Sequence, residues 1–341
     1  MASLANPDVE GEVEVEVDHS DARSSASDSD SAYSDTVCST ESLRSSIFDH
    51  EIKHGRTFHA FHSGKYVMPN DEGEQERMDL HYHAMRLAIE DKITHAPITN
   101  PHGILDLGTG TGIWAMDAAD AYPEAEVVGI DLSPIQPGWV PPNLQFEVAD
   151  ADEAWGFGED RFDLVHTRIM NGFGVSSWPH FYREAFSCLR PGGWVENQEF
   201  DCQIVSDDAS LPEDSTMAEW AKLWNQACEM IGKTGRCDPQ KLRDQMHEAG
   251  FINTRVIPYK MPIGPWPKDP MLKEAGKFGL VALHAGVYGM SVRLFLDVLG
   301  WSEERLQVFL ADFRKDLARK SIHAYWPTYI VIGQKPPLPA E

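Results

Sequence analysis

The stretch from Ile104 to Gly112, Ile-Leu-Asp-Leu-Gly-Thr-Gly-Thr-Gly, constrains the fold more than any other part of this chain. An apolar run that carries one acid, Asp106, is followed by glycine at every second position and by a helix-compatible segment from Ile113. Glycine lets a ligand approach the backbone, and the free N–H groups at a helix start favour an anion. The pattern predicts a strand, a tight turn and a helix that together hold a nucleotide-like ligand.

A second acid at a suitable distance supports this interpretation. Asp131 ends the next predicted strand, 19 residues after Gly112, where a carboxylate can accept both hydroxyls of a ribose. The dinucleotide fingerprint G-x-G-x-x-G is not matched, because Ile113 stands where its last glycine would fall, and there is no P-loop motif. Asp106 would repel a pyrophosphate but can accept hydrogen bonds from an ammonium group. S-adenosylmethionine, which has a ribose, an ammonium group and a carboxylate, fits this pattern best.

Strands and helices alternate along the folded region, which we place at residues 47–336. Helices are predicted at 71–93, 113–121 and 179–189, and such alternation with strands is typical of an α/β fold whose parallel sheet is covered on both faces. We expect strands at 103–107, 126–131, 144–148, 162–166, 194–200, 252–260 and 329–334.

The C-terminal half contains more helices, at 216–232, 238–250, 269–283 and 302–319. We interpret residues 262–320 as a helical lid inserted between the last two strands. Its aromatic residues either line an apolar substrate pocket or form the core where the lid meets the sheet; they are Trp266, Phe278, Tyr288, Phe295 and Trp301. The nearly apolar run 278–290 is too short to cross a bilayer, so no membrane segment is predicted.

The acidic residues are distributed unevenly. Residues 1–46 hold 11 Asp or Glu, 2 Arg, no Lys and 12 Ser, a composition that predicts a disordered tail. Within it, residues 10–18 alternate like a strand, but carboxylates on one face would repel each other. The tail is either a docking or phosphorylation segment for protein partners or a solubilising segment, and residues 337–341 form a second short tail.

Charge and cysteine content narrow the class of protein. The formal net charge is −25, from 29 Lys plus Arg against 54 Asp plus Glu, which argues against nucleic acid as a main partner. The five cysteines form no C-x-x-C motif, so we expect free thiols and no metal site. Without a secretory signal or a strong basic import cluster, a cytoplasmic location is expected, with a nuclear location as the alternative.

Several motifs carry a closer resemblance. They are the segments 64–71, 105–115, 129–137, 189–196, 265–269 and 322–327, which read GKYVMPND, LDLGTGTGIWA, GIDLSPIQP, LRPGGWVE, PWPKD and IHAYWP. Over roughly residues 50–336 the chain resembles the class I S-adenosylmethionine-dependent methyltransferases, and within them the fungal LaeA-like group of secondary metabolism. The resemblance implies a Rossmann-like sheet of seven strands, S-adenosyl-L-methionine as cofactor and a methyl acceptor as substrate.

The resemblance also assigns cofactor-binding roles. It implies that the methionine end lies against the glycine turn, formed by Asp106, Gly108, Thr109, Gly110 and Gly112. Asp131 would hold the ribose, with Leu132 beside the adenine and Asp150 accepting its amino hydrogen. Because three acids lie within residues 150–153, the register of Asp150 is open. Tyr66 either covers the cofactor or packs in the core.

Methyl transfer depends mainly on the positioning of the acceptor, because the methyl group on the sulfonium is already activated. A base is needed only if the acceptor must lose a proton. His166, Thr167 and Arg168 end the fourth strand of the sheet, where they would face the methyl group. His166 is a candidate general base or a histidine that is simply hydrogen bonded. Glu199 and Asp201 either orient an amine or a hydroxyl or are solvated carboxylates. His323 and Tyr325 either reach the pocket or close the core.

Two functions remain open at this point. The first is a methyltransferase that acts on an oxygen or nitrogen of a small secondary metabolite. The second is a regulator with the same fold that controls secondary-metabolite genes through nuclear protein partners. A protein that binds the cofactor without turnover is a weaker third option, since both the glycine turn and Asp131 are intact.

Overall fold

A seven-stranded sheet forms the centre of the protein in the computed structural model, which describes residues 14–18, 50–59 and 66–339. The strand order is β5-β4-β3-β6-β7-β9-β8. β5, β4, β3, β6 and β7 run parallel, and β9 is antiparallel to both of its neighbours. The α/β prediction with a mostly parallel sheet is confirmed. The strands are β3 (Gly103–Leu107), β4 (Glu126–Asp131), β5 (Leu144–Val148), β6 (Phe162–Arg168), β7 (Leu189–Phe200), β8 (Ile252–Pro262) and β9 (Tyr325–Gln334).

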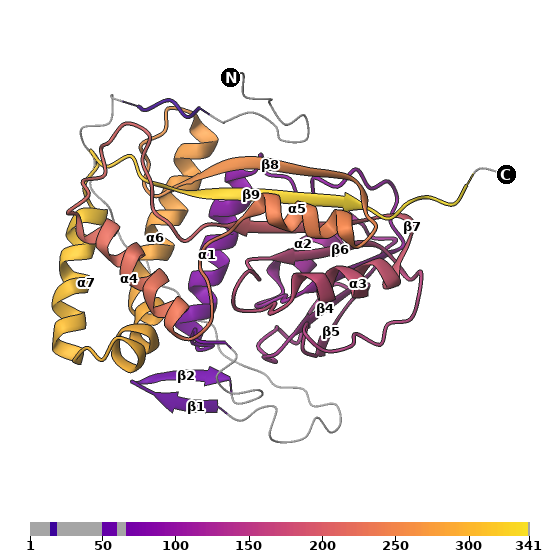
Figure 1. Ribbon diagram of the computed structural model, residues 1–341, viewed down its shortest axis with the longest axis horizontal. Coiled ribbons are helices and arrows are strands. Elements are labelled where there is room, and N and C mark those ends of the chain that lie inside the picture. Colours follow the sequence, from indigo (N-terminus) through magenta and orange to yellow (C-terminus); the bar gives the residue numbers. More distant parts are fainter. Residues whose placement is uncertain (1–13, 19–49, 60–65, 340–341) are drawn as a thin grey trace.

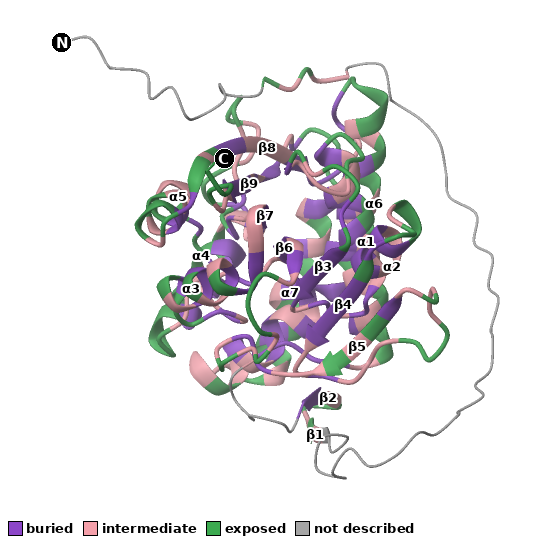
Figure 2. Cartoon of the chain, turned by 90° about the vertical axis from the view of Figure 1, so that its right-hand side faces the viewer, coloured by how far each residue is buried: buried purple, intermediate pink, exposed green. Residues whose placement is uncertain are grey.

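Helices cover both faces of this sheet (Figure 1). On one face, α1 (Glu72–Ala88) and α2 (Ile113–Ala121) share a buried cluster with the sheet that includes Trp114 and Ile104. On the other, α3 (Trp178–Cys188) and α5 (Pro239–Glu248) pack through residues such as Phe181 and Leu242. β3 and β4 are therefore buried in the middle of the molecule, whereas β5 lies at an edge (Figure 2).

A separate group of helices stands beside the sheet (Figure 1). It comprises α4 (Thr216–Met230), α6 (Pro270–Val292), the π-helical turn η2 (Arg293–Val298) and α7 (Glu303–Leu317). α6, η2 and α7 lie between β8 and β9 in the chain, in the place of the predicted insertion. Phe295 is fully buried here and meets Trp301 edge to face, with ring centroids 5.0 Å apart. Phe295 belongs to a core cluster against which Phe278, Tyr288 and Trp301 pack, and Trp266 is buried outside that cluster.

α6 is longer than the predicted helix, which was expected to end near residue 283. Glycines let neighbouring side chains lie directly on the helix: a Cβ at Gly286 would meet Arg77, and one at Gly289 would meet Arg56. By length and composition Pro270–Val298 could cross a membrane, but 56% of its most apolar window is buried inside the protein. Because its apolar face packs on α1 and β8, we interpret α6 as a core helix.

α1 is shorter than the predicted helix over 71–93. Asp71 caps its start, where the side chain accepts a hydrogen bond from the N–H of Glu74 at 3.1 Å. The helix ends at Ala88 because Glu90 and Asp91 adopt left-handed backbone, with φ of 67° and 53°. Its buried face includes Tyr82 and Met85, whereas His83 is exposed.

A two-stranded hairpin, β1 (His50–Lys53) and β2 (Arg56–His59), was not predicted. His54 and Gly55 form its turn with positive φ values of 51° and 73°. The Nε atom of Arg56 donates to a carboxylate oxygen of Asp71 at 2.5 Å. This ion pair joins the hairpin to the start of α1.

Five residues of the acidic tail, 14–18, lie extended against the loop before α6. The N–H of Asp18 donates to the carbonyl oxygen of Trp266 at 2.7 Å, and the N–H of Lys268 donates to that of Glu16 at 2.7 Å. Lys268 and Lys273 form ion pairs with Glu16 and Asp18. Lysines of the folded domain thus compensate for the carboxylates of residues 14–18, and disorder of the tail stays a prediction. The rest of residues 1–46 lies outside the described residues.

Three strands are longer in the structure than the segments predicted from the sequence. β6 reaches residue 168, β7 begins at residue 189 and β9 at residue 325, because each pairs with a neighbour beyond the segment predicted from its apolar residues.

Cys188, Cys202, Cys228 and Cys237 are free and buried, and Cys38 lies outside the described residues. Among the described residues there is no group of side chains that could hold a metal ion.

Candidate cofactor and acceptor site

The turn after β3 has the geometry that its glycines predict. Gly108, Gly110 and Gly112 have positive φ values of 70°, 60° and 82°. A Cβ at Gly108 would lie 2.1 Å from the sulfur of Met170, and one at Gly112 would lie 2.3 Å from the ring of Phe146. Only glycine fits these two positions, because the backbone is left-handed and the neighbours are close.

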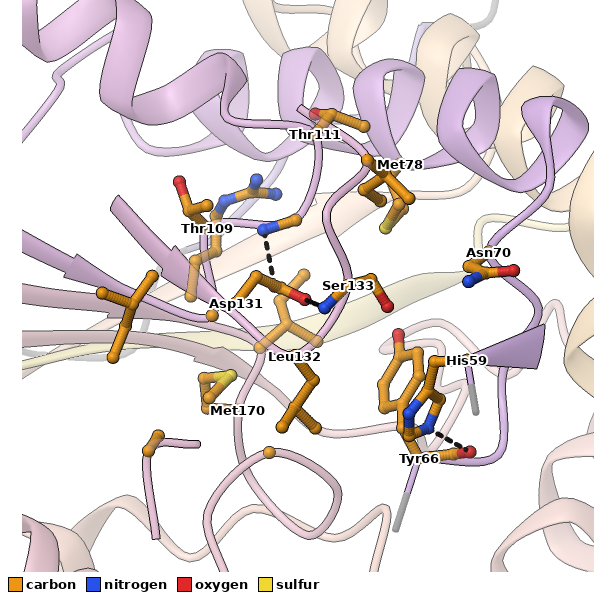
Figure 3. A pocket seen from close by; sticks show the side chains of 18 of the residues that line it. His59, Tyr66, Asn70, Met78, Thr109, Thr111, Asp131, Leu132, Ser133 and Met170 are labelled. Carbon is orange, nitrogen blue, oxygen red and sulfur yellow. Dashed lines mark hydrogen bonds between the residues drawn. The ribbon is translucent and has the colours of Figure 1, made fainter. Parts of the chain in front are cut away.

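A pocket with about 1030 Å³ of empty space, partly open to solvent, lies over this turn at the carboxyl ends of β3, β4 and β6. We call it the glycine-turn pocket. Figure 3 shows Asp131 between Thr109 and Ser133, with Tyr66 and His59 across the cavity. Its lining includes Tyr66, Gly108, Thr109, Gly110, Asp131, Leu132, Asp150 and Arg168. The fold therefore brings together most of the residues that the resemblance assigns to the cofactor.

The carboxylate of Asp131 is held by two backbone groups. It accepts hydrogen bonds from the N–H of Gly110 and from the N–H of Ser133, both at 2.9 Å (Figure 3). Burial raises its pKa to about 6, although these hydrogen bonds act in the opposite direction. Each oxygen keeps a further lone pair, so the group can still accept hydroxyl donors.

The other adenosine-side candidates also line this pocket. Leu132 and Ala151 supply apolar surface, and Asp150 lines the pocket while its carboxylate accepts the N–H of Asp152 at 2.9 Å. Among the acids at 150–153, Asp150 lines the pocket, whereas the carboxylate of Asp152 accepts a hydrogen bond from the N–H of Ser176. The sequence left this register open.

Asp106 and His166 lie beneath the turn and are absent from the pocket lining. Asp106 accepts hydrogen bonds from the hydroxyl of Thr109 at 2.7 Å and interacts with Nδ1 of His166 at 2.8 Å. The ring of His166 is fully buried and stacks on Trp114, with ring centroids 3.5 Å apart. This geometry does not support His166 as the general base, because the ring is sealed between β6 and α2. Asp106 shapes the turn instead of facing the cavity.

A second cavity, with about 750 Å³ of empty space, adjoins the first. We call it the aromatic pocket. Its apolar walls include Phe173, Phe200, Trp224, Leu283, Met290 and Trp326. The two pockets share Tyr66, Arg77, His81 and Ile169 in their linings, so they meet at these side chains. None of the five aromatic residues that the sequence suggested as a pocket wall lines either of these cavities.

Glu199 is the only carboxylate that lines the aromatic pocket in the described part of the chain. Its side chain is 1% exposed and accepts the N–H of Met170 at 2.9 Å and that of Asn171 at 3.3 Å. Burial raises its pKa to about 8, against the effect of these hydrogen bonds and of Arg168. A carboxyl group with such a pKa can exchange a proton near neutral pH.

The remaining candidates are engaged elsewhere. Thr167 accepts a hydrogen bond from Asn197 at 2.7 Å, and Asp201 pairs with Arg236 at 2.9 Å. His323 contacts Asp208 at 2.5 Å, and the hydroxyl of Tyr325 donates to Asp207 at 2.6 Å. These four residues line neither the glycine-turn pocket nor the aromatic pocket, so the geometry gives them structural contacts only.

The residues of the glycine-turn pocket fit S-adenosylmethionine. At Gly110 an added Cβ would meet only the sulfur of Met78, at 3.7 Å, so the turn leaves room beside the backbone there. The oriented carboxylate of Asp131 matches a ribose diol, and the apolar residues nearby match an adenine ring. Tyr66 lies where the two pockets meet, a position from which its ring can cover a bound cofactor.

Comparison with known proteins agrees with this geometry. A family profile described as "Methyltransferase domain" matches residues 81–256. Methyltransferase pytC of Aspergillus terreus is 42% identical over 313 residues, which cover 91% of this chain and 95% of that protein. The secondary metabolism regulator laeA of Aspergillus fumigatus is 36% identical over 305 residues, covering 89% of this chain and 81% of the relative.

Similarity to solved structures is weaker. Phosphoethanolamine N-methyltransferase 2 of Haemonchus contortus, in complex with S-adenosyl-L-methionine, is 16% identical with a TM-score of 0.43, covering 76% of this chain and 52% of the other. The family profile and the close relatives decide the assignment: this chain belongs to the S-adenosylmethionine-dependent methyltransferase family.

Proposed function

We propose that this methyltransferase transfers a methyl group to an oxygen or nitrogen of a small, largely apolar metabolite that binds in the aromatic pocket. The observation that carries the proposal is the junction of the two pockets at Tyr66, Arg77, His81 and Ile169. The cofactor supplies an activated methyl group, and a methyl acceptor in the neighbouring cavity would be able to approach it. Aromatic and aliphatic walls select apolar acceptors.

The side chains around the junction suit an acceptor that must lose or share a proton. Glu199 lies in the wall of the aromatic pocket with both oxygens oriented by backbone N–H groups. It can therefore orient an acceptor hydroxyl or amine and take its proton. Burial and the charges of Arg77 and Arg168 lower the pKa of His81 well below its usual value, so this imidazole is neutral.

Leu283→Trp tests the acceptor assignment. Leu283 lines the aromatic pocket and is 2% exposed, so the larger side chain would fill the cavity. We expect S-adenosylhomocysteine binding, measured by calorimetry, to persist while methylation of compounds extracted from a gene-deletion strain is lost. Val281→Trp is the matched control, because Val281 is on the same helix but 48% exposed. Equal turnover by both variants would contradict the proposed location of the acceptor.

A regulatory function is the second candidate, and the relatives supply the observation that favours it. Besides laeA of Aspergillus fumigatus, a protein named protein-methionine methyltransferase laeA from Emericella nidulans is 35% identical over 287 residues, covering 83% of this chain and 76% of that protein. On this alternative the acceptor is a protein in the nucleus, and the acidic tail would contact partners. On the first proposal the enzyme acts in the cytoplasm, without nucleic acid or membrane partners.

Metabolite profiles of wild-type and deletion strains separate the two candidates. An enzyme of one pathway predicts the loss of one methylated product and the accumulation of its unmethylated precursor. A regulator predicts that many unrelated products disappear together. Tagging the full chain with a fluorescent protein would locate it in the cytoplasm or in the nucleus.

A further inference from the structure

Arg168 presents an unsatisfied guanidinium to the glycine-turn pocket. It ends β6 and lines the cavity. Within the described residues its side chain forms no hydrogen bond or ion pair, and its Nε atom is buried without a partner. The guanidinium carbon lies over the ring of Tyr82, 4.9 Å from the ring centroid. Arg168 is partly buried, and a buried donor such as its Nε atom costs free energy unless a ligand supplies a hydrogen-bond acceptor.

The acids that interact electrostatically with Arg168 are already engaged. Glu199, on which the charge of Arg168 acts, accepts the N–H groups of Met170 and Asn171. Asp106 binds Thr109 and His166, and Asp79 accepts the hydroxyl of Thr111 at 2.6 Å. Burial lowers the pKa of Arg168 despite the opposing effect of these carboxylates. No carboxylate in the described part of the chain pairs with this guanidinium, so it can bind an anion from a ligand.

Arg77 is the other arginine that lines the glycine-turn pocket, and it differs from Arg168. Its Nε atom donates to Glu74 at 2.8 Å, and its aliphatic part packs against Gly286. Because its charge is compensated by Glu74, Arg77 is less suited to bind an external anion.

The strand order indicates which part of the cofactor reaches Arg168. Asp131, Leu132 and Asp150 place the adenosine half at the ends of β4 and β5. In the order β5-β4-β3-β6, the cofactor must then cross the glycine turn after β3, and its amino-acid half extends toward β6. Arg168 stands at that end, and the amino-acid half carries the only anionic group of S-adenosylmethionine.

We propose that Arg168 binds the carboxylate of the methionine part of the cofactor, an assignment that rests on the cofactor role proposed for this pocket. The planar guanidinium can donate two parallel hydrogen bonds to a carboxylate. Arg168 is thus a cofactor-binding residue that fixes the amino-acid half, while Asp131 fixes the ribose.

The test compares two ligands that differ only in this carboxylate. S-adenosylhomocysteine carries it, and decarboxylated S-adenosylhomocysteine keeps the amine, the thioether and the adenosine. Calorimetry on the full chain would measure both ligands with the wild type, Arg168→Met, Arg168→Lys and, as a control, Arg183→Met on the exposed surface of α3.

We expect Arg168→Met to bind S-adenosylhomocysteine about 10- to 100-fold more weakly and the decarboxylated ligand with unchanged affinity. Arg168→Lys should give an intermediate loss, because lysine keeps the charge without the two-pronged geometry. The melting temperature of the ligand-free protein should not fall in Arg168→Met, since no internal hydrogen bond or ion pair is lost and methionine can still pack on the ring of Tyr82. Arg183→Met should behave as the wild type.

Other outcomes overturn the proposal in distinguishable ways. Equal weakening of both ligands would show that Arg168 supports the pocket without contacting the carboxylate. Unchanged binding of both would assign the guanidinium to another anion, such as an acidic acceptor. If the wild type binds neither ligand, the cofactor role of the pocket fails first and this assignment fails with it.

Discussion

The carboxyl group of Asp131 links cofactor affinity to pH. Ribose hydroxyls donate to the ionised form, and burial raises the pKa of this group to about 6. As the pH falls through 6 the carboxylate is protonated, so S-adenosylhomocysteine should bind about tenfold more weakly at pH 5 than at pH 7.5. Titration calorimetry across this range measures the effect.

Fold stability should change in the opposite direction at this residue. Because the folded-state pKa is above the unfolded one, the contribution of Asp131 to stability is present at low pH and is lost as the pH rises through 6. Asp131→Asn removes the titrating carboxyl group. This variant should bind S-adenosylhomocysteine weakly at every pH, with no change of affinity around pH 6. A wild-type affinity that is constant between pH 5 and 7.5 would contradict the assigned role.

Some site residues could be read from the sequence because their signal is local. The glycines at 108, 110 and 112 and the acid at 131 sit at fixed distances from predictable strands. The sequence could not show that Asp106 and His166 pair beneath the turn, because that contact crosses two strands. Nor could it show that Arg168 lacks a partner, which depends on where every nearby carboxylate points.

Among the elements, α6 depends on a glycine at its crossing with the segment after β8. A Cβ at Gly276 would lie 1.9 Å from the carbonyl oxygen of Gly264, and the N–H of Gly264 donates to the carbonyl oxygen of Gly276 at 3.0 Å. Gly276→Ala should therefore lower the free energy of unfolding by roughly 3 kcal/mol, because backbone must move. Urea unfolding followed by circular dichroism measures this loss.

Gly73→Ala is the matched control for this effect. Gly73 also lies in a helix, is exposed, and has no atom within 3.4 Å of an added Cβ. There, alanine should stabilise the protein by about 0.5–1 kcal/mol through helix propensity. If both variants lose the same stability, the close crossing of α6 is not the cause.

The predictability of the elements followed the strength of their local pattern. β3, β4 and β5 were predicted with the bounds that the structure shows, because β3 and β4 are short, mainly apolar runs and β5 alternates apolar and polar residues. The hairpin of β1 and β2 was missed because its polar sequence has no alternating apolar face. An apolar substrate pocket was one of two alternatives for the insertion, but the walls of the aromatic pocket were not predicted. They come from separate loops, strands and helices that meet only in the folded chain.

For the whole molecule, repulsion among the excess negative charges destabilises the folded state. The formal net charge is −25, so salt should screen repulsion between carboxylates and favour the folded state. Raising sodium chloride from about 10 to about 150 mM shortens the Debye length from about 30 to about 8 Å. We expect the melting temperature to rise by about 2–4 °C at pH 7.5, measured by scanning fluorimetry.

The same salt increase at pH 5 provides the comparison. Protonation of carboxylates there reduces the net charge, so the rise should be smaller. A melting temperature that falls with salt at pH 7.5 would mean that attractive pairs, such as Arg56 with Asp71, outweigh the excess of negative charge.

The position of β9 between β7 and β8 imposes an order on assembly during synthesis. β8 leaves the ribosome before α6, η2 and α7, yet its partner in the sheet is β9, which follows all three. Until that last strand arrives, the inner edges of β7 and β8 remain open to other chains. Nascent molecules that stall in the helical insertion would therefore be the ones most prone to aggregate.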